Sequence, residues 1–140
     1  MALPLDQIDP GVVAWIDTRV LLADPRLMRA SGSGVFRSGP FLCVAVGPGY
    51  TTWLELTTRP GKWNHRFHIR REWRTGGPAF WRAHDNYVNN VAETFVGRDV
   101  VFADAARNEP HNWPQNRARV APEGIEAITL EMRSRNCLTV

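Results

Sequence analysis

The stretch Pro40–Thr57, PFLCVAVGPGYTTWLELT, decides the fold. Its first seven residues form an uninterrupted apolar run, which is typical of a strand buried on both faces. The Gly-Pro-Gly that follows turns the chain, and a second strand begins at Tyr50. Two apolar strands joined by a short turn that contains glycine predict a β-hairpin. On the second strand the side chains alternate between the faces, so that Trp53, Glu55 and Thr57 share one face.

Shorter strands are predicted on both sides of this hairpin. Upstream, Gly11–Asp17 reads GVVAWID and is largely apolar on both faces of an extended chain. Downstream, Arg66–Arg70 alternates, so that Phe67 and Ile69 point inwards while His68 and the two arginines point outwards. The other expected strands lie over Tyr87–Val91, Glu93–Val96 and Val100–Ala103.

Helices are expected near both ends of the chain. A C-terminal helix is predicted from Pro122, because proline suits the first helical position. A short helix is expected within Val20–Ala30, where Pro25 would lie in the first turn. The segment Phe80–His84 fits either one helical turn or a loop, and the polar Asn108–Asn116 is interpreted as a surface loop. The apolar stripe of the C-terminal helix consists of Ile125, Ile128 and Met132.

The basic residues are concentrated in one segment of an otherwise ordinary globular composition. The 140 residues are 44% hydrophobic and 22% charged, which predicts one domain with a core of useful size. Residues 59–82 hold seven cations and one acid, Glu72, whereas the rest of the chain holds ten cations and thirteen acids. Cations interleaved with aromatic rings suit a nucleic-acid strand, because phosphates meet arginines and bases stack on rings. The same pattern also fits an arginine-rich loop that is merely solvated.

Several other classes of protein are disfavoured. Cys43, inside an apolar strand, and Cys137 support neither a disulfide framework nor a zinc site. The histidines lack a metal-binding spacing, so neither a metal nor another cofactor is predicted. No apolar signal-peptide core follows Met1, and no apolar run approaches the ~20 residues of a membrane helix. We therefore expect a cytoplasmic protein that does not interact with a membrane.

Three local patterns, in order along the chain, carry a resemblance to a known family. Gly11–Asp17, the strand end Leu54–Thr58 (LELTT) and Arg119–Glu123 (RVAPE) resemble elements of the PemK/MazF family of toxin endoribonucleases. Gly39-Pro40 is similar to the Arg-Pro that opens the second strand of that family. The resemblance implies a mainly β fold with added helices, a small SH3-like β-barrel with a C-terminal helix. Residues 1–140 would form a single domain with long loops at 18–39 and 59–85.

The resemblance also implies a chemistry, in which a 2′-hydroxyl of RNA attacks the adjacent phosphate without a metal. Thr57, at the place of the family's threonine, would donate a hydrogen bond. The family's arginine falls on Gly39, so Arg37, two residues upstream, becomes the candidate that stabilises charge on the phosphate. The acid of the family's Gly-Ser-Glu-Gln loop has no counterpart here. His68 or His65 is therefore the candidate for proton transfer, since histidine titrates near neutrality.

Substrate binding is assigned to the basic segment. The chain after Thr58 is longer than in the family, and its cations would follow a single RNA strand with Trp63 or Trp73 stacked on a base. Each tryptophan equally fits burial in the core or in a dimer interface. The cluster NYVNN at residues 86–90 fits either base-edge contacts or turn chemistry. The predicted RNA-binding residues are Lys62, Trp63, His65, Arg66, Arg70, Arg71 and Arg74.

Two functions follow as hypotheses. The first is the toxin of a toxin–antitoxin pair, a homodimeric endoribonuclease that cleaves single-stranded RNA and is held inactive by a small antitoxin protein. The alternative is a non-catalytic SH3-like barrel that binds nucleic acid or a protein through its basic face. The absent loop acid favours the alternative, whereas the match at Thr57 and the basic aromatic segment favour the nuclease. A fold that serves assembly alone, with incidental basicity, is a third reading.

Overall fold

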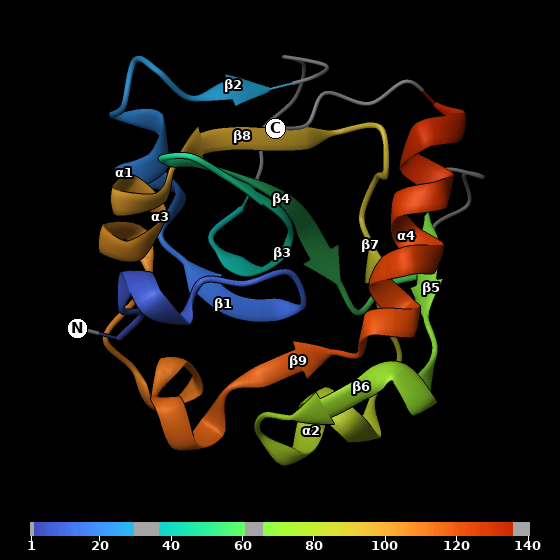
Figure 1. Cartoon of the computed structure of the whole chain (residues 1–140). Helices are drawn as coiled ribbons and strands as arrows, with labels where there is room; N and C mark the ends of the chain where they lie inside the picture. Colours follow the sequence, from blue (N-terminus) through green and yellow to red (C-terminus); the bar gives the residue numbers. More distant parts are fainter. Residues whose placement is uncertain (1, 30–36, 61–65, 136–140) are drawn as a thin grey trace.

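The predicted hairpin forms the centre of the fold. The computed structural model of the chain describes residues 2–29, 37–60 and 66–135 (Figure 1). Strands β3 (Gly39–Gly47) and β4 (Tyr50–Thr57) pair antiparallel, with Phe41 opposite Glu55. The turn between them holds Gly49 at a φ of 74°, where any larger residue would be strained. The hairpin prediction is therefore confirmed.

Antiparallel strands extend the hairpin into one sheet. The added strands are β1 (Val12–Ile16), β2 (Met28–Arg29), β5 (Phe67–Ile69), β6 (Arg74–Gly76), β7 (Asn86–Val88), β8 (Thr94–Arg98) and β9 (Ala118–Val120). The order is β2-β8-β4-β3-β1-β9-β6, and within the described residues the edge strands β2 and β6 do not pair with each other, so the sheet is open there. Strand β4 pairs with β8 through Tyr50–Leu54 and with β7 through Leu56–Thr57, and β5 lies beyond β7.

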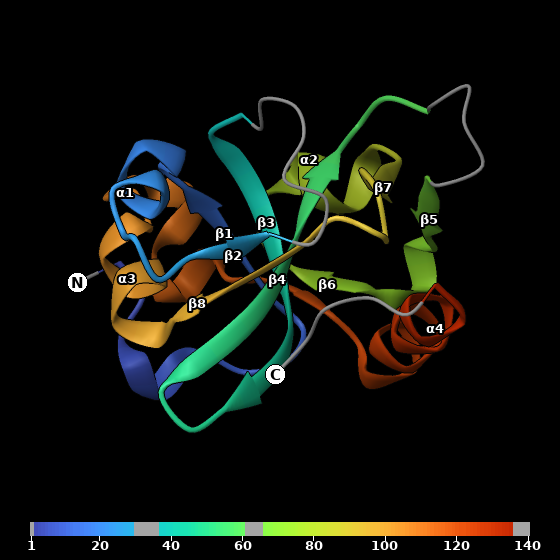
Figure 2. The same ribbon diagram turned by 90° about the horizontal axis from the view of Figure 1, so that it is seen from above.

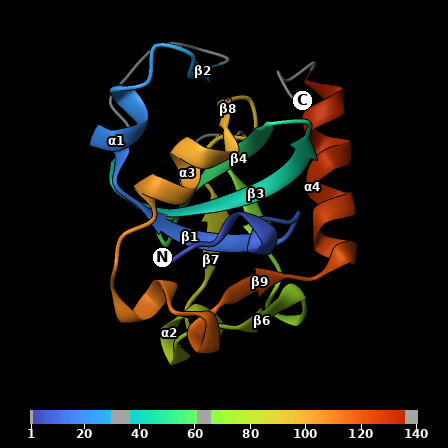
Figure 3. The same ribbon diagram turned by 60° about the vertical axis from the view of Figure 1, so that its left-hand side comes forward.

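Helices cover opposite ends of this sheet. The α-helices of the described residues are α1 (Thr18–Leu22), α2 (Ala79–Ala83), α3 (Asp99–Ala105) and α4 (Pro122–Ser134). Short 3-10 turns occur at Leu5–Gln7, Arg71–Trp73, Pro110–Asn112 and Pro114–Asn116. Helices α1 and α3 lie side by side at one end of the molecule and α4 lies at the other, in both Figure 1 and Figure 2. Strands β9 and β6, with α2 beside them, form the lower part of the molecule in Figure 3.

Buried side chains of the described residues gather in two clusters, to which β4 contributes alternate residues. Trp53 stacks on Phe102 at 4.9 Å in the cluster that includes α1 and α3. Leu54 lies in the other cluster, with Ile128 of α4 and Trp81 of α2. Full burial of each large apolar side chain contributes ~1.5–3 kcal/mol. Strand β4 is thus held on both faces before it reaches its polar end.

The coarse prediction, a mainly β fold with added helices and a C-terminal helix, is confirmed. Helix α4 begins at Pro122 as expected, and Ile128 and Met132 of its stripe are buried. Gly124 is buried as well. A larger residue would be too close to its neighbours there, since a Cβ would lie 3.0 Å from the Cβ of Trp73. For the segment Phe80–His84 the helical alternative is confirmed, since Phe80–Ala83 lie in α2 and His84 is its C-cap.

One expected strand is a helix. Val100–Ala103 lies within α3, so the strand prediction there is wrong. A short apolar run fits a buried helix as well as a strand, and the local pattern does not separate them. Here the helix is selected by packing, since Phe102 stacks on Trp53.

The helix expected within Val20–Ala30 is displaced. Helix α1 begins earlier, at Thr18, because the carboxylate of Asp17 accepts the backbone N–H of Arg19 at 3.0 Å and caps the first turn. The helix ends at Leu22, so Pro25 does not lie in it, and part of the remaining segment is strand β2.

The two segments expected to be long loops contain regular structure. Within the parts that the structure describes, 18–39 includes α1 and β2, and 59–85 includes β5, β6 and α2. Strands β6 and β9 were not predicted, because three residues show too little alternation to identify a strand. The expected surface loop at 108–116 contains Asn112, which is fully buried.

Candidate functional site

A cleft of about 440 Å³ lies at the open end of the β3–β4 hairpin, away from its turn. Antiparallel pairing brings the residues that precede β3 next to the end of β4, and both segments line the cleft. Among the described residues that line it, three are arginines and one is an acid. Its charged and hydrogen-bonding side chains include Arg37, Glu55, Thr57, Arg59, Arg66 and Asn89.

Glu55 is the acid of this cleft. Its Oε2 accepts the backbone N–H of Arg37 at 3.0 Å, and its Oε1 accepts Nδ2 of Asn89 at 2.8 Å. Burial raises the pKa of Glu55 and repulsion from Glu93 adds to the rise, whereas the Arg37 N–H and the charge of Arg66 oppose it. A carboxylate whose pKa is moved towards neutrality is suited to accept and release protons near pH 7. Glu55 is not among the catalytic residues that were predicted from the sequence.

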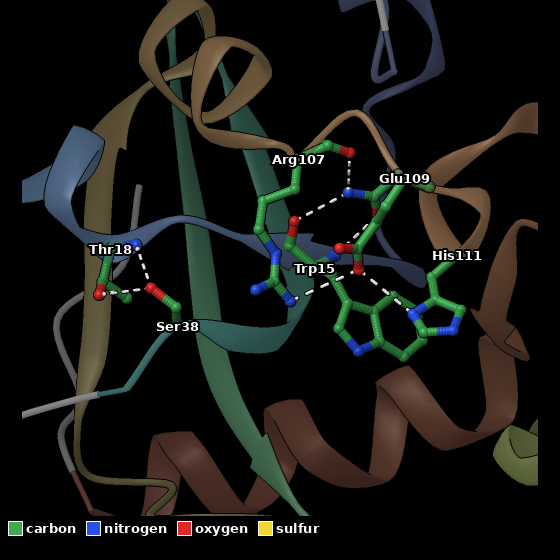
Figure 4. Close-up of polar contacts among 7 residues, drawn as sticks. Trp15, Thr18, Ser38, Arg107, Glu109 and His111 are labelled. Carbon is green, nitrogen blue, oxygen red and sulfur yellow. Dashed lines mark hydrogen bonds and ion pairs between the residues drawn. The ribbon is translucent and has the colours of Figure 1, made fainter.

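Two of the predicted catalytic residues, Arg37 and Thr57, line the same cleft. Oγ1 of Thr57 accepts the backbone N–H of Arg59 at 3.2 Å, which leaves the hydroxyl proton to be donated to a ligand. The side chain of Arg37 is exposed at the start of β3. The neighbouring Ser38 is held by the N–H of Thr18, which donates to its Oγ at 3.0 Å (Figure 4). Hydrogen bonds thus hold the backbone N–H of Arg37 and the side chain of Ser38.

Arg66 adds a cation to the cleft from the start of β5. Its NH1 donates to the carbonyl of Arg59 at 2.7 Å, and its Nε is buried with no hydrogen-bond partner in the described part of the chain. A buried donor without an acceptor costs ~1–3 kcal/mol. An anionic group bound in the cleft would remove that cost, so the arginines favour an anion there in spite of Glu55.

The third predicted catalytic residue, His68, lies on β5, which is separated from β4 by β7. The cleft-lining residues of the described ranges do not include it. Thr57 is opposite Tyr87, and Tyr87 is opposite His68, so the three side chains share one face of the sheet. Two strand spacings of ~4.8 Å separate His68 from Thr57 by roughly 10 Å. Its Nε2 lies 3.2 Å from Oδ1 of Asp85.

A neighbouring cavity of about 510 Å³ adjoins the cleft on this side. Thr58 lines both cavities, so they meet at the end of β4. Tyr87 and Asp85 line the second one, and the ring of His68 lies 5.1 Å from that of Tyr87. The cluster at residues 86–90 is therefore divided, with Tyr87 and Asn89 facing cavities while Asn86 is buried and donates to the carbonyls of Trp81 and His84.

The predicted RNA-binding residues that the structure describes do not form one surface. Arg70 and Arg71 are exposed outside both cavities. The prediction for Arg74 is wrong, because this side chain is only 5% exposed and its guanidinium donates to the carbonyls of Trp81 and His84. The Arg74 side chain thereby stabilises the C-terminal end of α2, and it is not accessible to a ligand. Lys62, Trp63 and His65 lie outside the described residues.

Trp73, one of the two tryptophans considered for base stacking, packs against the protein itself. Its half-buried ring lies 6.5 Å from the ring of Phe67 in a stacked arrangement. The guanidinium of Arg70 lies over its ring at 5.1 Å, a distance typical of a cation–π contact. These contacts favour a packing role for Trp73 over base stacking.

A further polar cluster, which no sequence motif indicated, surrounds Trp15 at the end of β1 (Figure 4). Oε1 of Glu109 lies 3.4 Å from NH2 of Arg107 and 3.2 Å from Nδ1 of His111. The ring of His111 lies 5.0 Å from that of Trp15. Asn112 binds the backbone of Trp15 from the same loop. These contacts close the end of β1, which is a structural role.

Within the described residues, no group of three or more His, Cys, Asp or Glu side chains is placed to hold a metal ion. The helices of those residues do not include one that is long and apolar enough to cross a membrane. Comparisons with protein-family models, with curated proteins and with solved structures found no match for this chain. The residues of the cleft are therefore the basis on which a function is assigned.

Proposed function

We propose that this protein is an endoribonuclease that cleaves single-stranded RNA without a metal, in the cleft formed by Arg37, Glu55 and Thr57. One observation carries the proposal: a carboxylate with a raised pKa, a hydroxyl donor and several arginines line the same cleft. Transfer of a phosphoryl group to a neighbouring hydroxyl requires a proton acceptor, hydrogen-bond donors and cations. Glu55 supplies the proton acceptor for which the sequence offered only histidines.

The reaction begins when the Glu55 carboxylate takes the proton of a ribose 2′-hydroxyl. The 2′-oxygen then attacks the adjacent phosphorus, and Arg37 and Arg66 stabilise the negative charge that develops on the phosphate oxygens. Thr57 donates its hydroxyl proton in a hydrogen bond to one of these oxygens. The bond from phosphorus to the 5′-oxygen breaks, and that oxygen takes a proton from water. The hydroxide that remains takes the proton from Glu55, which restores the water and the carboxylate. The products are a 2′,3′-cyclic phosphate and a 5′-hydroxyl.

The wider biological proposal follows from the resemblance to the PemK/MazF family. The open, bent sheet with its C-terminal helix would be a divergent form of the SH3-like barrel of that family. The protein would act in the cytoplasm as the toxin of a toxin–antitoxin pair. It would be a homodimer held inactive by a small antitoxin protein. A short antitoxin-like reading frame directly upstream of the coding sequence would support this role.

The test is incubation of the purified protein with mixed single-stranded RNA in excess chelator. We expect cleavage with cyclic phosphate ends. Glu55→Gln should lower the rate about 10²–10⁴-fold, the range for loss of a general base. Arg37→Ala should lower it roughly 10²–10³-fold, as for loss of one group that stabilises the transition state. Glu72→Gln, an exposed acid of the same basic segment, is the matched control and should leave the rate unchanged.

The outcomes separate the two hypotheses. RNA binding that weakens with salt but is not followed by cleavage would remove the nuclease and leave the non-catalytic binding module. Cleavage that survives both Glu55→Gln and Arg37→Ala would show that the reaction takes place elsewhere on the protein. Cleavage that is lost only on addition of the chelator would exclude the metal-independent reaction.

A further inference from the structure

The second cavity, next to the cleft, has the opposite chemical character. The cleft is lined by three arginines and one acid, whereas the second cavity has an acid, Asp85, and no arginine among the described residues that line it. Its other lining residues are Thr58, Pro60, His84 and Tyr87. Its volume of about 510 Å³ lies within the roughly 300–1,000 Å³ of small-molecule sites. The two cavities meet at Thr58, one residue beyond Thr57. A nucleotide has the same two parts, an anionic phosphate and an uncharged ring.

Tyr87 lines this cavity, and His68 lies beside Tyr87 on the neighbouring strand β5. Their rings lie 5.1 Å apart and are tilted by 41° to each other, and both side chains are partly exposed. The ring of Tyr87 offers a π-face to a nucleobase, and base–aromatic stacking does not depend on the identity of the base. Stacking alone therefore gives affinity without selectivity.

Asp85 supplies the selectivity. Its side chain is 66% exposed, and the contact with Nε2 of His68 uses Oδ1, one of its two carboxylate oxygens. A carboxylate only accepts hydrogen bonds, through about four lone-pair sites. Of the four RNA bases, guanine alone presents two adjacent donors, N1–H and the 2-amino group, on its Watson–Crick edge. Adenine, cytosine and uracil each place an acceptor beside their donor, which would face the carboxylate unfavourably.

We infer that the cavity lined by Tyr87 and Asp85 binds a guanine base next to the cleaved phosphate. This inference rests on the proposed function, because the neighbouring cleft must hold that phosphate. Tyr87 stacks on the base, and both carboxylate oxygens of Asp85 accept from its Watson–Crick edge. The enzyme would then cut single-stranded RNA beside guanine.

Two measurements test the inference, with Asp85→Asn as the variant and Asp104→Asn, an exposed acid on α3, as its matched control. The first is titration of the protein with each of the four nucleoside 5′-monophosphates, followed by NMR. The second is mapping of the cut sites on mixed RNA. We expect guanosine monophosphate to bind about 5- to 150-fold more tightly than the other three, as for one good bidentate contact to a base edge. Asp85→Asn should abolish that preference, because its amide replaces one acceptor with a donor, and the control should not.

The combined outcomes distinguish this inference from the proposed function. RNA cut without regard to guanine, in a pattern that Asp85→Asn leaves unchanged, would overturn the guanine site and leave the nuclease intact. Selective binding of guanosine monophosphate that depends on Asp85, with no RNA cleaved, would overturn the nuclease and leave the guanine site. Equal binding of the four nucleotides would overturn the inference whatever the RNA assay gives.

Discussion

Replacement of Asn112 by alanine should destabilise the protein by about 3 kcal/mol. The side chain is fully buried, and its amide lies beside Trp15 as the peptide group of another strand would. Its Oδ1 accepts the N–H of Trp15 at 2.7 Å, and its Nδ2 donates to the carbonyls of Trp15 and Arg107 at 2.8 and 2.7 Å. Each such hydrogen bond contributes ~0.5–1.5 kcal/mol net, and alanine leaves the buried N–H of Trp15 without its acceptor. The two carbonyls keep the backbone N–H groups of Arg107 and Glu109 as donors.

Urea unfolding at equilibrium measures the effect, with Asn116→Ala as the matched control from the same loop. Asn116 donates a single exposed hydrogen bond to the carbonyl of Pro110 in the described structure, so its loss should cost less than about 1 kcal/mol. For a chain of this size, the predicted loss at Asn112 corresponds to a fall in Tm of about 10 °C. Asn112→Asp keeps the acceptor for Trp15 but turns an oxygen towards two carbonyls, so it should cost at least as much as alanine. The reasoning is refuted if Asn112→Ala costs no more than Asn116→Ala.

Two further predictions concern the basic segment and the cleft. Arg74→Ala should lower the free energy of unfolding by about 3 kcal/mol, because two hydrogen bonds from a charged group to backbone carbonyls are lost. The control Arg71→Ala should leave the free energy of unfolding unchanged. An equal loss in both variants would contradict the assignment of Arg74 as buried and Arg71 as exposed. Glu55→Gln should change the pH dependence of stability. Burial raises the pKa of Glu55, so the folded state binds its proton more tightly than the unfolded state, and this contribution is lost as pH rises from the unfolded pKa of about 4.3 through the folded value. Between pH 4 and pH 7, the free energy of unfolding of the unchanged protein should therefore fall progressively relative to that of the glutamine variant. If the two proteins show the same dependence of this free energy on pH, the pKa of Glu55 is not raised by folding.

The parts of the fold that could be predicted from sequence have long, repeated patterns. The hairpin combines a seven-residue apolar run, a glycine turn and an eight-residue alternating strand, and α4 combines Pro122 with a stripe that extends over two turns. Strands β6 and β9 exist because they pair with each other across more than forty residues of chain. Three residues carry no pattern that predicts such a partner.

The candidate site was predictable only in part, because residue type does not reveal burial. Arg74 and Arg71 belong to the same basic run, yet one is enclosed by carbonyls and the other is exposed. Glu55 had a usable signal, since strand alternation placed it on the same face as Thr57, two residues away. Its significance depends on the approach of Arg37, which only the antiparallel pairing of β3 with β4 brings about.

The position of the cleft at the open end of the hairpin bears on when the protein becomes active. A hairpin that starts to pair at its turn closes the shortest loop first, so the pairing of Gly47 with Tyr50 would precede that of Phe41 with Glu55. Arg37 and Glu55 come together only when the strands have paired along their whole length. On the proposed function, a chain in which β3 and β4 have not yet paired along their length would hold the proton acceptor Glu55 apart from Arg37. Nuclease activity would then require the complete hairpin.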